Sequence, residues 1–150
     1  DVMDGAFVPS ISFGMPVLKS LRSCTGLVFD VHMMVEEPGR YIQDIKDSGA
    51  DLICVHQEAC VHLDRTVSQI KEAGLKVAVA LNPATPVSTL EYILPSLDIQ
   101  VDGGVTAGNV RDLMEAGANV FVAGSAVFQG DAAANVKEFL DVFRQYEALS

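Results

Sequence analysis

Three side chains that can bind a metal ion or carry a proton occur in short apolar stretches of this chain: Asp1 in DVM, His32 in VFDVHMMV and Asp102 in IQVD. Such stretches are typical of buried strands, where a carboxylate or an imidazole is unexpected. Two carboxylates and an imidazole suit a divalent metal ion. Two carboxylates on different strands can also take a proton from one face of a carbon atom and return one to the other face. A metal ion between them would stabilise the enediolate that forms.

The pattern around Asp1 is repeated around His32. Because side chains alternate along a strand with a period of two, Met3 shares the face of Asp1, and Met34 shares the face of His32. Methionine is apolar and adaptable, so the pair can line a planar intermediate without requiring a hydrogen bond. Taken singly, a strand histidine is more often a hydrogen-bonded core residue, and a strand-terminal aspartate is more often a helix N-cap. The joint occurrence of such residues on one face of several strands favours a metal or catalytic site.

Two Gly-rich turns follow the last two predicted strands, VDGGV at 101–105 and VAGSAVF at 122–128. Backbone N–H groups in such turns, with a short helix starting near Ser125, form a common phosphate site. The alternative is that the glycines only make tight turns. Because two such turns follow one another at the end of the chain, we favour the interpretation as a phosphate-binding site.

A further polar pair, His56 and Glu58, lies in the stretch VHQEA. The two residues can form a second polar cluster or support the site structurally. We expect the structural role, since no neighbouring strand shows a matching pattern.

The elements that must position these residues alternate along the chain. Apolar runs predict strands over 1–3, 27–33, 52–57, 76–81, 99–102 and 120–124. Amphipathic segments predict helices over 15–23, 38–49, 62–74, 87–97, 107–117 and 133–149. This alternation predicts an α/β fold with a parallel sheet. Polar residues at the ends of several strands, without a GxGxxG turn, favour a (β/α)8 TIM barrel, incomplete here because six strands are predicted.

Composition narrows the class of protein. The 150 residues, 49% of them apolar, suffice for one domain over 1–150 with a hydrophobic core. The formal net charge of −10 argues against nucleic acid and against a membrane surface as partners, so an anionic ligand has to be held locally by backbone N–H groups. No stretch is long and apolar enough to span a membrane. Three cysteines without CxxC spacing favour a reducing, cytoplasmic setting.

Six stretches in order closely resemble the D-ribulose-5-phosphate 3-epimerase family: DVMDGAFVPSISFG, DVHMMVEEPGRYI, VHQEA, VALNPATP, QVDGGV and GANVFVAGSAVF. The resemblance implies a (β/α)8 barrel that interconverts ribulose 5-phosphate and xylulose 5-phosphate in the pentose phosphate pathway. It also implies a divalent metal cofactor (Zn, Fe, Mn or Co), a phosphorylated ketopentose substrate and a homo-oligomer.

The resemblance assigns a role to each matching position. It implies that Asp1 and Asp102 are the two acid/base groups and that, with His32, they are metal ligands. His32, Met3 and Met34 match positions that contact the substrate. The sugar-phosphate contacts match Gly103, Gly104, Gly124 and Ser125.

The chain also departs from the family. A second metal-ligand histidine and a first strand with a substrate-contacting serine have no counterpart before Asp1. We expect a break in the family pattern near residues 97–99, where a strand, a helix and a Gly-rich loop that closes on the phosphate are missing; the alternative is a smaller closed barrel. Two further alternatives for function are a sister epimerase acting on a six-carbon ketose phosphate (allulose 6-phosphate) and an inactive barrel fragment that serves as an assembly module.

Overall fold

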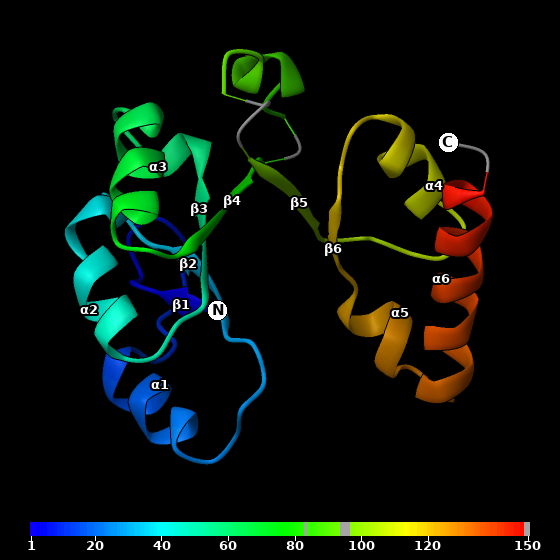
Figure 1. Cartoon of the computed structure of the whole chain (residues 1–150), viewed down its shortest axis with the longest axis horizontal. Helices are drawn as coiled ribbons and strands as arrows, with labels where there is room; N and C mark the ends of the chain where they lie inside the picture. Colours follow the sequence, from blue (N-terminus) through cyan, green and yellow to red (C-terminus); the bar gives the residue numbers. More distant parts are fainter. Residues whose placement is uncertain (83, 94–96, 149–150) are drawn as a thin grey trace. The chain divides into compact units, whose positions relative to one another are not determined.

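The computed structural model describes residues 1–82, 84–93 and 97–148 and divides the chain into two compact units, Asp1–Leu97 and Asp98–Ser150. Strands and helices alternate within each unit (Figure 1), so the predicted α/β class is confirmed. The boundary falls near residues 97–99, where the family pattern is expected to break; residues 94–96 beside it lie outside the described residues. Among the described helices, none combines the length and the apolar character needed to cross a membrane.

Within the described part of the first unit there are four strands: β1 (Val2–Met3), β2 (Asp30–Met34), β3 (Leu52–His56) and β4 (Lys76–Ala80). Each strand pairs in parallel with the next along the chain. Three α-helices connect them: α1 (Met15–Arg22), α2 (Ile42–Asp47) and α3 (Leu63–Glu72). The described residues of this unit also form three short 3₁₀ helices: η1 (Pro38–Arg40), η2 (Gln57–Ala59) and η3 (Val87–Leu90).

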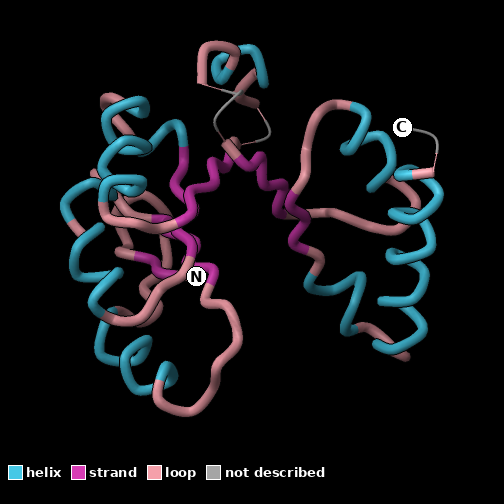
Figure 2. The backbone as a smooth tube through the Cα atoms, in the orientation of Figure 1, coloured by secondary structure: helices cyan, strands magenta, loops and turns pink. Residues whose placement is uncertain are grey.

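The sheet of the first unit has two different faces because strand side chains alternate. The face toward the helices is buried and apolar, and it consists of Val31, Met33, Ile53, Val55, Val77 and Val79. It packs against the apolar stripes of α1, α2 and α3, which lie on one side of the strands in Figure 2. The opposite face carries both strand histidines. Cys54 lies opposite His32 and Ala80 lies opposite His56 in the strand register, so small side chains leave room for the imidazole rings.

Three predicted elements of the first unit differ from the structure. The strand predicted over 27–33 begins only at Asp30, because the Arg22 guanidinium donates to the carbonyl oxygens of Thr25 and Leu27 and keeps this segment out of the sheet. The side chain of Leu27 is consequently 74% exposed. The helix predicted over 38–49 is divided into η1 and α2.

The helix predicted over 87–97 also differs. The described part is the 3₁₀ helix η3 followed by a turn, and residues 94–96 lie outside the described residues. Its backbone hydrogen bonds join residues three apart, as in Thr89 N–H to Pro86 O and Ile93 N–H to Leu90 O. Such bonds give short helical pieces rather than a three-turn α-helix.

In the second unit, residues 98–148 form two parallel strands and three helices: β5 (Asp98–Asp102), α4 (Val110–Glu115), β6 (Val120–Val122), α5 (Gly124–Phe128) and α6 (Ala132–Glu147). Val105, Val110 and Phe139 form its buried core. The Asp131 carboxylate caps α6 by accepting hydrogen bonds from the N–H groups of Ala133 and Ala134. The short helix predicted near Ser125 is α5.

Candidate active site

The register of β1 and β2 brings Asp1 and His32 together. Met3 lies opposite Met34 in this parallel pair, so the residues two positions earlier in each strand are also level. Asp1 Oδ1 lies 3.5 Å from His32 Nδ1. The imidazole is buried, whereas 59% of the Asp1 side chain is exposed. The site thus joins a fixed imidazole to an accessible carboxylate.

The loop after β1 holds the backbone of Asp1 in place. The Ser12 hydroxyl donates to the Asp1 carbonyl oxygen (2.7 Å) and accepts from the Met3 N–H (2.9 Å). The Asp4 carboxylate caps this loop at Ala6 N–H (2.8 Å) and reaches the N–H of Glu36 beyond β2 (2.8 Å). These backbone donors hold the pKa of Asp4 below its usual value; the Glu36 N–H has the largest effect and the Ala6 N–H the next largest. The loop therefore ties the start of β1 to the end of β2.

The Asp1 and His32 donors fit two ligands of one divalent ion. Two ligand atoms that each lie about 2.1 Å from a tetrahedral ion are about 3.4 Å apart. The separation of Asp1 Oδ1 and His32 Nδ1, 3.5 Å, matches this value. A carboxylate oxygen and an imidazole nitrogen are also ligand types that zinc accepts.

A second histidine contacts His32 from β3. His56 Nε2 lies 2.8 Å from His32 Nε2, and both side chains are buried. The Phe7 ring packs at a tilt against the His56 ring, with 5.0 Å between the ring centroids. On its other side, His56 Nδ1 lies 3.5 Å from Glu58 Oε2. His56 is thus placed between the candidate ligand and a second carboxylate.

Glu58 is held by the segment that follows β4. Its Oε1 accepts hydrogen bonds from the Asn82 N–H (2.8 Å) and from the Thr85 hydroxyl. Partial burial raises the pKa of Glu58, but the hydrogen bonds from Thr85 and Asn82 and the nearby His56 outweigh it, so the net pKa is lower than usual. Glu58 is therefore a carboxylate at neutral pH.

The other predicted site residues belong to the second unit. Asp102 is the last residue of β5 and is exposed, and it lies opposite Val122 of β6 in the register. The segments that follow β5 and β6 therefore begin side by side at the same edge of this two-stranded pair. Gly103 and Gly104 have φ angles of 91° and 70°, which residues that carry a side chain rarely adopt. The convergence of Asp102 with Asp1 and His32 stays a prediction.

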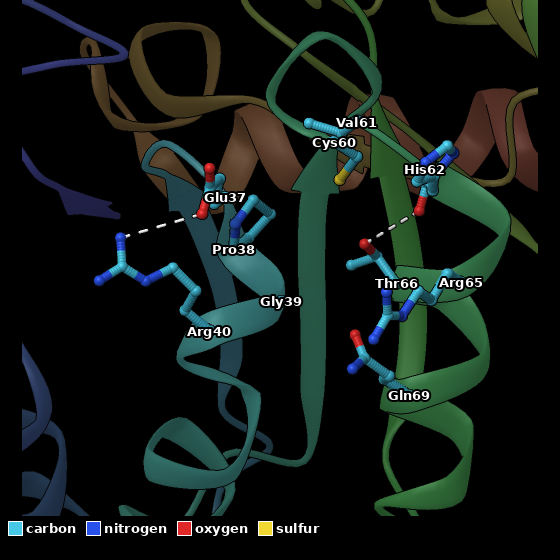
Figure 3. A pocket seen from close by; sticks show the side chains of 10 residues that line it. All are labelled: Glu37, Pro38, Gly39, Arg40, Cys60, Val61, His62, Arg65, Thr66 and Gln69. Carbon is cyan, nitrogen blue, oxygen red and sulfur yellow. Dashed lines mark hydrogen bonds and ion pairs between the residues drawn. The ribbon is translucent and has the colours of Figure 1, made fainter.

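A separate hollow in the first unit, shown in Figure 3, lies between η1 and α3. Arg40 and Arg65 are among its lining residues, and Arg40 faces Glu37 across 3.9 Å. None of the predicted site residues lines it. The cluster formed by Asp1, His32, His56 and Glu58 is thus distinct from this hollow.

The sequence of the chain is similar to known epimerases. The ribulose-phosphate 3-epimerase family model matches residues 1–100 and 95–128. The ribulose-phosphate 3-epimerase of Bacillus subtilis is 40% identical over 168 residues, covering 85% of this chain and 77% of that protein. The chloroplastic ribulose-5-phosphate-3-epimerase of Arabidopsis thaliana is 41% identical over 169 residues, covering 85% of this chain and 60% of that protein. These alignments exceed the 150 residues of the chain, so the relatives contain residues that have no counterpart here.

Solved structures resemble the chain in fold. The 3-keto-L-gulonate-6-phosphate decarboxylase from Vibrio cholerae aligns with a TM-score of 0.64 and 13% identity, covering 95% of this chain and 88% of that one. Orotidine 5'-phosphate decarboxylase from Pyrococcus horikoshii aligns with a TM-score of 0.58 and 17% identity, covering 87% of this chain and 81% of that one. These neighbours are TIM-barrel enzymes, so the predicted TIM-barrel fold, incomplete in this chain, is confirmed.

The family model covers most of the chain in two matches that meet at residues 95–100. Relatives from a bacterium and a plant are both about 40% identical to it. The chain belongs to the ribulose-phosphate 3-epimerase family of enzymes.

Proposed function

We propose that this enzyme interconverts D-ribulose 5-phosphate and D-xylulose 5-phosphate by epimerisation at C3. The observation that carries the proposal is the 3.5 Å approach of Asp1 Oδ1, just before β1, to His32 Nδ1 in the paired strand β2. The substrate is suggested by relatives named ribulose-phosphate 3-epimerase. The proposed cofactor is a divalent metal ion (Zn, Fe, Mn or Co) held by Asp1, His32 and Asp102.

In the proposed reaction, two carboxylates act on opposite faces of C3. Asp1 accepts the C3 proton from one face, and Asp102 donates a proton to the other face of the enediolate; the roles exchange in the reverse direction. The exposure of Asp1 suits it to meet a substrate. A bound metal ion would supply positive charge that stabilises the enediolate.

Two further groups complete the proposed substrate site. Met3 and Met34, which lie opposite each other, would line the apolar side of the reacting carbon. The turn at Gly103–Gly104 and the first residues of α5, Gly124 and Ser125, would hold the phosphate through backbone N–H groups. Their adjacent strand ends support this assignment, and local donors are needed because the net charge of −10 repels anions.

The proposed function is tested by adding ribulose 5-phosphate to the chain with Zn²⁺ or Mn²⁺ and measuring xylulose 5-phosphate. In D₂O, one deuterium should enter the product at C3. Faster turnover of allulose 6-phosphate would favour the six-carbon epimerase. Absence of turnover with both substrates and both metals would favour the inactive assembly module.

The two overlapping family matches at residues 95–100 support a further part of the proposal. We propose that a strand, a helix and the phosphate-closing loop of the relatives have no counterpart between about Leu97 and Ile99. We also propose a cytoplasmic location, because three cysteines without CxxC spacing favour a reducing setting.

A further inference from the structure

His32 and His56 share one hydrogen bond between two carboxylates. Their Nε2 atoms lie 2.8 Å apart, so one of these nitrogens donates and the other accepts. Asp1 faces the outer nitrogen of His32, and Glu58 faces the outer nitrogen of His56, each at 3.5 Å. For two neutral imidazoles, the direction of the shared bond therefore decides which outer nitrogen carries a proton.

Only one direction leaves His32 ready to bind a metal. If His32 Nε2 donates, its Nδ1 keeps a lone pair toward Asp1, and His56 carries its proton on Nδ1, toward Glu58. If His56 Nε2 donates, His32 Nδ1 carries a proton toward Asp1, and the lone pair of His56 Nδ1 faces Glu58. A metal ligand must be an unprotonated nitrogen, so the second arrangement blocks the site.

The surroundings of the two carboxylates favour the first direction. The Glu58 side chain is 23% exposed and is held by Asn82 and Thr85, whereas the Asp1 side chain is 59% exposed. Water screens a charge more strongly at an exposed site, so Glu58 acts on its imidazole neighbour more strongly than Asp1 does. Phe7 packs on His56 and limits reorientation of that ring.

We propose that Glu58, acting through His56, is a positioning residue that fixes His32 in the tautomer protonated on Nε2 and leaves Nδ1 for the metal ion. This inference rests on the proposed metal site at Asp1 and His32. It assigns His56 and Glu58 a defined task, whereas the sequence predicted only structural support.

The first test compares Zn²⁺ affinities, measured by competition with a chromophoric chelator. Glu58→Gln keeps the size of the side chain but removes the charge that selects the tautomer. It should weaken Zn²⁺ binding about 10- to 100-fold, as is typical for groups that orient a metal-binding histidine. Glu72→Gln, an exposed change of the same type on α3, should leave the affinity unchanged.

A double variant shows whether Glu58 acts through His56. His56→Phe keeps a ring beside Phe7 but removes both nitrogens. If the inference is right, His56→Phe combined with Glu58→Gln binds Zn²⁺ no more weakly than His56→Phe alone. Additive losses would show that Glu58 acts by another route and would overturn the inference.

The second test reads the tautomer without metal or substrate. In the metal-free protein at about pH 8, where free imidazoles are neutral, the ¹⁵N spectrum of His32 should show an unprotonated Nδ1 and a protonated Nε2. Glu58→Gln should mix or reverse this assignment, and Glu72→Gln should not. A protonated Nδ1 in the wild type, or the same spectrum in Glu58→Gln, would overturn the inference. Failure of the wild type to bind Zn²⁺ with this tautomer present would instead count against the proposed function.

Discussion

Met3 of β1 lies directly opposite Met34 of β2, and this single register relationship sets the geometry of the candidate site. Because side chains two residues apart share a face, the same register puts Asp1 level with His32. A shift by one residue would turn one member of each pair to the other face of the sheet. The repeated pattern of a polar residue followed two positions later by methionine thus places Asp1 beside His32 in one layer and Met3 beside Met34 in the next.

Asp102→Asn should lower the turnover of ribulose 5-phosphate by at least about 100-fold, because the amide cannot carry the proton. Substrate binding should change less than turnover. Steady-state kinetics with saturating metal measure both, with the exposed Asp112→Asn on α4 as control. Epimerisation by Asp102→Asn at the wild-type rate would refute its role as an acid/base group.

Gly124→Val should raise the KM for the phosphorylated sugar, because the added side chain crowds the approach of the phosphate to the turn. A side chain can begin at this position, since an added Cβ at Gly124 meets no atom within 4 Å. Gly108→Val serves as a control in the same unit, where an added Cβ meets only Thr106 Oγ1 at 3.7 Å. An unchanged KM in Gly124→Val would argue against a phosphate site at this turn.

Ile53→Ala should destabilise the first unit by about 2–5 kcal/mol, because the Ile53 side chain is fully buried between the sheet and the helices. Urea unfolding followed by circular dichroism measures the change. Val61→Ala, at a residue that is 80% exposed, should change the free energy of unfolding by less than about 0.5 kcal/mol. Equal effects of the two substitutions would contradict the assignment of the core.

Asp4→Asn should change the dependence of stability on pH. Hydrogen bonds from the Glu36 and Ala6 N–H groups hold the pKa of Asp4 below its usual value in the folded state. The ionised carboxylate therefore contributes stability above the pKa of the unfolded state, and the contribution disappears as the pH falls through the folded pKa. Urea unfolding at several pH values should show a loss of stability in Asp4→Asn near neutral pH that shrinks in acid. A loss that is constant with pH would contradict the role of the charge.

Much of the architecture could be predicted because it follows from periodicity. All six predicted strands are present, with shifted ends, since runs of β-branched residues bounded by polar groups mark them clearly. The strand end at Leu27 could not be predicted, because Leu27 and Val28 are apolar. In the structure Arg22 donates to the Leu27 carbonyl oxygen, and both residues are exposed outside the sheet. The 3₁₀ helix η3 could not be predicted either, since an apolar pattern does not distinguish it from an α-helix.

The candidate site was predicted in part for a similar reason. Asp1 and His32 could be paired because each has a methionine two residues later. His56 has no such partner, and its contact with His32 depends on the offset between β2 and β3, which a single sequence does not specify. The hydrogen bonds of Glu58 to residues after β4 are likewise set by the tertiary fold.

The metal site is the central claim, and zinc-edge anomalous diffraction from crystals grown with Zn²⁺ tests it most directly. The account predicts one strong anomalous peak with ligand distances of about 2.0–2.2 Å to His32 Nδ1 and to carboxylate oxygens of Asp1 and Asp102. A peak bound by other residues, or Asp1 and His32 side chains turned to different faces of the sheet, would contradict it.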